Sequence, residues 1–153
     1  LPRGAGTSLA GQCCNVAVVF DFTKYMNKIM EINPQERFAR VQPGVVLDTL
    51  RNQAELHQLT FAPDPSTHNR CTIGGMIGNN SCGTHSLLGG KTVDNIEELR
   101  ILLYDGAQLT VGAPADATRR AARPPAGPQS ERDPKPRTPR NQRGASTPSR
   151  VPP

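Results

Sequence analysis

The stretch TIGGMIGNNSCG, residues 72–83, is the starting point for interpreting the fold. Four of its residues are glycines, and they alternate with asparagine, serine and threonine. It lies in a longer segment, residues 61–92, whose many turn residues predict a loop. Loops of that length inside a compact domain are uncommon unless they serve a function. Because glycine leaves main-chain N–H groups accessible, this composition suits a bound anion such as phosphate.

A second glycine-rich segment, LPRGAGTSLAGQ, opens the chain at residues 1–12 and precedes the apolar run VAVVF. Gly4, Gly6 and Gly11 indicate either positive φ angles or a ligand that lies against the main chain. An ordinary surface turn is the alternative when this segment is considered by itself. Two segments that both offer backbone donors can hold a ligand with two phosphates from opposite sides. A dinucleotide is such a ligand.

Two common nucleotide-binding motifs do not account for these segments. A Rossmann fingerprint requires G-x-G-x-x-G followed directly by a helix. Here Leu9 occupies the position of the third small residue, and the segment that follows is typical of a strand. A P-loop requires Gly-Lys followed by Ser or Thr, and the sequence contains no such run.

Five short motifs occur in order: RGAGTSL at 3–9, VQPGV at 41–45, DPST at 64–67, TIGG at 72–75 and NNSCG at 79–83. Together they resemble the vanillyl-alcohol-oxidase-type (PCMH-type) FAD-binding domain. Their spacing is most similar to the branch that holds D-lactate dehydrogenase, glycolate oxidase and D-2-hydroxyglutarate dehydrogenase. The ending GGKTVDNIEELRILLYDG is similar to versions fused to an iron–sulfur domain. The resemblance covers residues 1–112.

The resemblance implies that FAD lies extended across the domain between two segments. The first would hold the pyrophosphate through its N–H groups, the second would line the other side, and Pro63 and Asp64 would approach the flavin ring. The expected cofactor-binding residues are Arg3, Gly4, Ala5, Gly6, Thr7, Ser8, Gly11, Pro63, Asp64, Thr72, Gly74, Gly75, Asn79, Ser81 and Gly83. Some members attach FAD covalently through a histidine of the first segment. Because Thr7 and Ser8 stand there, we expect noncovalent binding.

The resemblance further implies an FAD-linked dehydrogenase or oxidase that oxidises a 2-hydroxy acid of the D-lactate or glycolate type. The protein would position the cofactor, which carries the chemistry of hydride transfer to flavin N5. The electron acceptor would be an iron–sulfur domain, a cytochrome, a quinone or an electron-transfer flavoprotein. An iron–sulfur cluster would belong to a domain outside this sequence. No residue here is identified as catalytic, so we expect no activity from this chain alone. We also expect weak FAD binding, because the flanking strands that should fix the two glycine segments are missing from this sequence.

Charge divides the chain into two parts. Residues 1–112 form the expected partial FAD-binding domain, whereas residues 113–153 contain nine basic residues, three acidic ones and ten of the fifteen prolines. This composition predicts a disordered tail. A non-enzymatic basic binding protein that uses the tail is therefore an alternative function. Because the tail lacks aromatic residues among its arginines, we expect no nucleic-acid partner.

The pattern of apolar residues predicts an α+β fold. The expected elements are a strand over 17–22, a helical turn over 23–32, a strand over 36–44, an amphipathic helix over 45–59 and a hairpin over 95–111. The hairpin is expected around Asp105-Gly106, a strong turn signal. Met26 and Met30 are expected in the core, and His57 is expected on the surface of the helix.

A zinc-binding module is a further alternative. His68-x-x-Cys71 and Cys82-x-x-His85 have the two-residue gaps typical of zinc ligands. Since the intervening residues are explained by flavin contacts, we expect no metal.

No apolar run approaches the ~20 residues of a membrane span, and no signal-peptide pattern occurs at the start of the sequence. Four cysteines, two of them adjacent, make a poor disulfide framework. We therefore expect a reduced protein in the cytoplasm without a membrane span. Peripheral attachment at the inner face of the membrane is the alternative.

Overall fold

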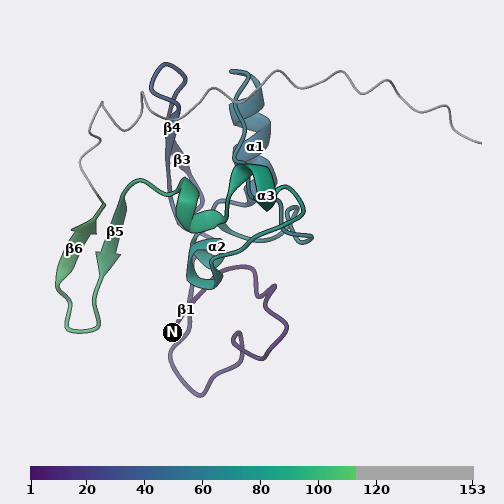
Figure 1. The fold of residues 1–153 in the computed structure, drawn as a ribbon. Coiled ribbons are helices and arrows are strands. Elements are labelled where there is room, and N and C mark those ends of the chain that lie inside the picture. The colour runs from purple at the N-terminus through teal and green to yellow at the C-terminus, as the bar shows by residue number, and fades with distance from the viewer. Residues whose placement is uncertain (113–153) are drawn as a thin grey trace, which may run out of the picture.

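Short strands and helices alternate along residues 1–112, which are the residues that the computed structural model describes (Figure 1). This mixture confirms the α+β class. The elements are β1 (Pro2–Arg3), β2 (Phe20–Asp21), β3 (Ile29–Asn33), β4 (Phe38–Val41), α1 (Leu47–Glu55), α2 (Ile73–Asn79), α3 (Ser86–Gly89), the 3₁₀ helix η1 (Thr92–Asn95), β5 (Leu99–Leu102) and β6 (Gln108–Val111). The tail over 113–153, for which the sequence predicts disorder and a binding role, lies outside the described residues.

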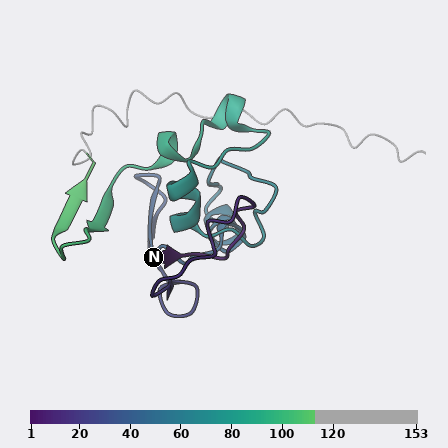
Figure 2. The ribbon, with the colours of Figure 1, turned by 90° about the horizontal axis from the view of Figure 1, so that it is seen from below.

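The strands of residues 1–112 form three two-stranded sheets. β1 pairs with β2 in parallel, whereas β3–β4 and β5–β6 are antiparallel. The β5–β6 hairpin stands to one side of the other elements in both views (Figures 1 and 2). All four residues of β6 are exposed, as are three of the four in β5. The core therefore lies elsewhere, around the two larger helices.

The core joins the buried face of α1 to the segment that opens α2. Its members are apolar residues with little solvent exposure: Val45, Leu47, Leu50, Ala54, Cys71, Ile73 and Met76. Ile29, Val41, Phe61 and Ile77 are partly buried against this cluster. Full burial of an aliphatic side chain of this size stabilises a fold by about 1.5–3 kcal/mol. The TIGG motif therefore belongs to the best-packed part of the structure.

The residues before α1 and before α2 are joined directly by main-chain hydrogen bonds. Val46 and Thr72 form an antiparallel bridge. The Leu47 N–H donates to the Cys71 carbonyl at 3.0 Å, and the Ile73 N–H donates to the Val45 carbonyl at 2.9 Å. These bonds fix the start of one helix relative to the start of the other.

Three of the expected elements occur, with shorter bounds. The helix over 45–59 is α1, Leu47–Glu55, with His57 exposed beyond its end. The strand over 36–44 is β4, Phe38–Val41. The hairpin over 95–111 is β5–β6, and Gly106 takes a φ of 88° in its turn. That left-handed conformation is the one for which glycine is favoured.

The helical turn expected over 23–32 is wrong. Ile29–Asn33 is strand β3, which pairs with β4. The Asn33 side chain closes the connection, because its Oδ1 accepts the N–H groups of Gln35 and Glu36 at 3.1 and 3.0 Å. The expected core position of two methionines is wrong as well, since Met26 is 39% exposed and Met30 is 61% exposed.

Two other expectations need correction. Of the strand expected over 17–22, only Phe20–Asp21 pairs with another strand. The segment over 61–92, expected as a loop, contains α2 and α3, and η1 begins at its last residue. No helix within residues 1–112 combines the length and the apolar character that crossing a membrane requires.

Candidate functional site

The first glycine loop, residues 4–11, presents a row of main-chain donors. Within residues 1–112, the N–H groups of Gly4, Ala5, Gly6, Thr7 and Ser8 have no hydrogen-bond acceptor. These five residues are exposed or half-buried. Successive N–H groups that are not used inside the protein can bind an anion where the main chain turns them toward one point.

The glycines of this loop are required for two different reasons. Gly6 and Gly11 have φ angles of 69° and 82°, which confirms the positive φ expected for both. Gly4 does not have a positive φ, so the first of the two alternatives does not hold for this residue. A Cβ at Gly4 would instead clash with the Thr72 hydroxyl oxygen. The absence of a side chain at Gly4 therefore lets the loop lie directly against Thr72.

The first glycine loop and the second glycine cluster, residues 72–83, are brought together by the fold. Besides the contact between Gly4 and Thr72, the Asn79 Nδ2 donates to the Ser8 Oγ at 2.9 Å. Ser8 and Asn79 are 71 positions apart in the sequence. The structure therefore places the two segments side by side.

The N–H groups that open α2 are already used inside the protein. The Gly74 N–H donates to the Pro43 carbonyl at 2.8 Å, and the Gly75 N–H donates to the Thr72 hydroxyl at 3.3 Å. A Cβ at Gly74 would lie 2.7 Å from the Pro43 Cβ, which is too close. These residues shape the wall of the site and fix its position, and the free donors belong to the first glycine loop.

A cavity of about 370 Å³ lies beside the first glycine loop. Its lining comes from separate stretches of chain: Arg3, Gly4, Ala5, Thr23, Val46, Asn69 and Arg70. Two arginines and two of the loop residues with free N–H groups belong to this lining, and residues of these kinds suit an anion. Asn69 and Arg70 could not be identified from the sequence, because neither belongs to a glycine-rich motif.

Arg3 is held by an ion pair with Asp21 across the β1–β2 pairing. The Thr23 hydroxyl and the Thr23 N–H donate to the same carboxylate at 2.6 and 2.9 Å. These bonds, followed by the Arg3 side chain, lower the pKa of the Asp21 carboxyl below its usual value. Asp21 is therefore a fixed anion that orients the Arg3 guanidinium at the edge of the cavity.

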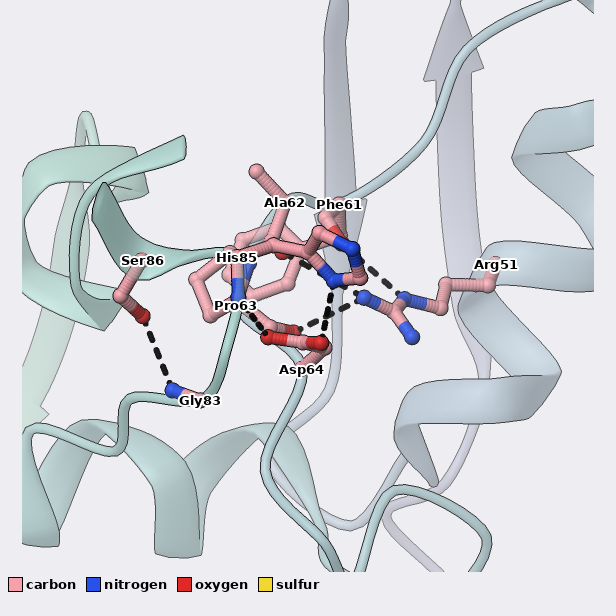
Figure 3. Close-up of polar contacts among 8 residues, drawn as sticks. All are labelled: Arg51, Phe61, Ala62, Pro63, Asp64, Gly83, His85 and Ser86. Carbon is pink, nitrogen blue, oxygen red and sulfur yellow. Dashed lines mark hydrogen bonds and ion pairs between the residues drawn. The ribbon is translucent and has the colours of Figure 1, made fainter. Parts of the chain in front are cut away.

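A second polar group surrounds the expected flavin-facing residues Pro63 and Asp64 (Figure 3). Arg51 of α1 reaches across to this segment and donates to three successive carbonyls. Its Nε bonds the Phe61 oxygen at 3.0 Å, and its Nη2 bonds the Ala62 and Pro63 oxygens at 3.4 and 3.1 Å. One guanidinium thus fixes the course of residues 61–63 and leaves Pro63 buried.

Asp64 and His85 are joined by two hydrogen bonds in the same group (Figure 3). The His85 Nδ1 contacts the Asp64 Oδ2, and the His85 N–H donates to the Asp64 Oδ1 at 3.0 Å. Burial of Asp64 opposes ionisation. The His85 N–H and imidazole, with the Arg51 charge, outweigh that effect and lower the pKa of the Asp64 carboxyl. The imidazole itself is 73% exposed, which leaves its other edge accessible.

Gly83 lies close to this pair, and Ser81 is fixed nearby in the sequence by contacts with Thr92. A Cβ at Gly83 would clash with the Asp64 carbonyl oxygen, so the main chain approaches closely there. The Gly83 N–H donates to the Ser86 Oγ at 2.9 Å. The Ser81 carbonyl accepts the N–H and the hydroxyl of the buried Thr92 at 3.0 and 2.7 Å. The end of the second glycine cluster is therefore fixed by packing.

The residues considered as zinc ligands do not form a ligand set within residues 1–112. His85 is bonded to Asp64, and the His68 Nδ1 contacts the Asp48 carboxylate at 2.8 Å. Cys71 is buried in the core, and that burial raises the pKa of its thiol. Within the same residues, no group of three or more His, Cys, Asp and Glu side chains gathers as metal ligands would.

The open donors, the adjacent arginines and the closely packed glycine segments fit the phosphates of a dinucleotide. The sequence profile of the FAD binding domain family matches residues 1–112. The chain belongs to this family. The PCMH-type resemblance drawn from the five motifs is thereby confirmed, and FAD is the cofactor that the family indicates.

Several relatives of this FAD binding domain match in sequence. D-2-hydroxyglutarate dehydrogenase of Pseudomonas putida is 45% identical over 108 residues, 71% of this chain and 11% of that protein. The GlcD subunit of glycolate oxidase from Escherichia coli is 39% identical over 115 residues, 74% of this chain and 23% of that protein. The chain therefore spans between about a tenth and a quarter of the length of these curated relatives.

Solved structures agree on the fold of the domain. Two crystal forms of alkyldihydroxyacetonephosphate synthase match with TM-scores of 0.64 and 0.65 at 24% identity. The matches cover 74% and 79% of this chain and 21% and 24% of those chains. At this identity the likeness concerns the fold alone.

Residues of the site that the motifs did not reveal come from outside the glycine segments. Arg51 lies on α1, and its role depends on three carbonyls that are 10–12 positions away. The spacing around His85 suggests only a zinc ligand. The one sequence signal for its pairing with Asp64 is that Asp64 opens the motif DPST and His85 lies two residues after the motif NNSCG.

Proposed function

We propose that this chain is the FAD-binding portion of a flavin-dependent oxidoreductase that oxidises a 2-hydroxy acid. The observation that carries the proposal is the row of free N–H groups at Gly4–Ser8, packed against Thr72. Such donors suit the pyrophosphate of a dinucleotide. The names of the relatives, which act on 2-hydroxyglutarate and glycolate, support the substrate class.

FAD would be held noncovalently between the two segments. Gly4 to Ser8, with Gly11, would bind the pyrophosphate, and Arg3 would add positive charge at its edge. Pro63 and Asp64, fixed by Arg51, would approach the flavin ring. The second glycine cluster would form the opposite wall through Thr72, Gly74, Gly75, Asn79, Ser81 and Gly83.

FAD, when bound, would accept at N5 a hydride from the α-carbon of the substrate. The residues of this chain would bind and orient the cofactor, and the catalytic residues would lie elsewhere in the longer protein. Reoxidation would use an iron–sulfur domain, a cytochrome, a quinone or an electron-transfer flavoprotein. We place the protein in the cytoplasm, with peripheral attachment at the inner membrane face as the alternative.

Titration with FAD, followed by flavin fluorescence, tests the role of the first glycine loop. We expect measurable but weak binding of FAD. Backbone donors orient an anion well only where packing fixes them, and residues 4–8 are exposed or half-buried. Gly4→Ala should lower the affinity for FAD at least about tenfold, ~1.4 kcal/mol, since the added methyl group pushes the loop away from Thr72. Gly78→Ala is the matched control, because a Cβ there meets nothing within 4 Å. Equal FAD affinity of Gly4→Ala and the unmodified chain would contradict the proposal.

Activity provides a second test. We expect no oxidation of D-lactate, glycolate or D-2-hydroxyglutarate by this chain with an artificial acceptor. Catalysis needs a base within hydrogen-bond reach of the substrate, about 2.6–3.2 Å between heavy atoms, and no such base is identified in this chain. Turnover by the isolated chain would show that the catalytic group lies within it.

A further inference from the structure

Two adjacent cysteines follow the first glycine loop and have no part in the proposed function. Cys14 is exposed and Cys13 is half-buried, and both are free thiols. Their sulfur atoms lie 3.9 Å apart. The Cys14 N–H donates to the Gly11 carbonyl at 3.1 Å, which closes a tight turn and fixes the main chain that carries both side chains.

The separation of the two sulfur atoms matches a shared metal ion. Thiolates bind zinc at about 2.3 Å with tetrahedral angles, which places two such sulfurs roughly 3.8 Å apart. Soft thiolate ligands select ions such as Cu(I) and Zn(II) over Mg²⁺ or Ca²⁺. The turn therefore holds two soft ligands at the spacing that one ion requires.

We propose that Cys13 and Cys14 bind one soft, thiophilic metal ion as a two-thiolate chelate. Each thiol loses its proton to solvent, and two metal–sulfur bonds form without a change in oxidation state. Within residues 1–112, no group of three or more His, Cys, Asp and Glu side chains gathers as metal ligands would. Water or a small external ligand would fill the remaining coordination positions.

The chelate lies beside the first glycine loop. A Cβ at Gly6 would be 3.7 Å from the Cys13 Cβ, so Cys13 packs against that glycine. The site is separate from the His68–Cys71 and Cys82–His85 pairs, where the histidines are bonded to aspartates. It also requires no flavin, so its test is independent of the proposed function.

Cadmium serves as the probe, in a calorimetric titration of the reduced, metal-free chain without FAD. We expect one tight equivalent. Cys13→Ser and Cys14→Ser should each bind cadmium about 100-fold more weakly, because one remaining thiolate loses the effective concentration of the second. Cys82→Ser, which removes an exposed thiol elsewhere, should bind like the unmodified chain.

Alkylation followed by mass spectrometry identifies the ligands directly. One equivalent of cadmium should protect Cys13 and Cys14 together, while Cys82 stays reactive. Far-UV circular dichroism verifies that each variant keeps the fold. The proposal is overturned if the chain binds no cadmium, if either single serine variant binds it as tightly, or if Cys82→Ser abolishes the tight equivalent.

Discussion

The first glycine loop and the second glycine cluster are similar in composition and opposite in physical character. In the first, Gly6 and Gly11 have positive φ angles, and the N–H groups of residues 4–8 have no acceptor within residues 1–112. In the second, the Gly74 and Gly75 N–H groups are bonded inside the protein, and neighbouring main chain leaves no room for a Cβ at Gly83. Apart from Gly4, which packs against Thr72, the glycines of the first loop provide conformation and accessible donors, whereas Gly74 and Gly83 of the second cluster provide close packing.

The largest expected effect comes from adding a methyl group in the second glycine cluster. Gly83→Ala should lower the free energy of unfolding by about 3 kcal/mol, because the clash is with main chain that cannot move without repacking. Gly6→Ala should cost about 1–2 kcal/mol, since its new side chain has room and only the positive φ is strained. Urea unfolding measures both. Equal losses would mean that the two segments do not differ in the way described.

The contacts of Arg51 with residues 61–63 give the next largest effect. Arg51→Met should cost about 2 kcal/mol, because three carbonyls lose a charged donor. Arg40→Met, at an exposed position of β4, is the control and should have little effect. If both variants unfold at the same urea concentration as the unmodified chain, Arg51 does not fix residues 61–63.

Acid should expose the contribution of Asp64. The pKa of the Asp64 carboxyl is lowered in the folded chain. The carboxylate therefore stabilises the fold fully at a pH above the ordinary pKa of aspartate, and this stabilisation is lost as the pH falls through the lowered pKa. Thermal unfolding between about pH 5 and pH 2 should therefore be less pH-dependent for Asp64→Asn than for the unmodified chain. The same dependence in both would place the acid-sensitive group elsewhere.

The smallest effect is expected where the two segments meet through side chains. Ser8→Ala removes the bond from Asn79 and should cost about 0.5–1 kcal/mol, because both groups can bond to water instead. Ser66→Ala, outside both segments, is the control. A loss as large as that of Gly83→Ala would mean that this bond, rather than packing at Gly4, joins the segments.

The two glycine segments could be recognised from motifs, because the residues of each are neighbours in the sequence. The first glycine loop, residues 4–11, could be recognised from its composition. The supporting contacts could not be predicted in this way. Arg51 acts on carbonyls outside its own helix, and the Asp64–His85 pair joins residues 21 positions apart.

Elements that are stabilised by local interactions could be predicted from the amino-acid pattern alone. These are the amphipathic helix α1 and the Asp105-Gly106 hairpin. β3 and α2 could not be predicted from the local pattern, because their formation depends on long-range contacts. β3 gains its hydrogen bonds from β4 instead of from a helix of its own. α2 contains three glycines, each of which costs about 1 kcal/mol relative to alanine in a helix. α2 forms because Ile73 and Met76 enter the core and Thr72 caps its start. The free energy gained by burying the two side chains outweighs the low helix propensity of the glycines.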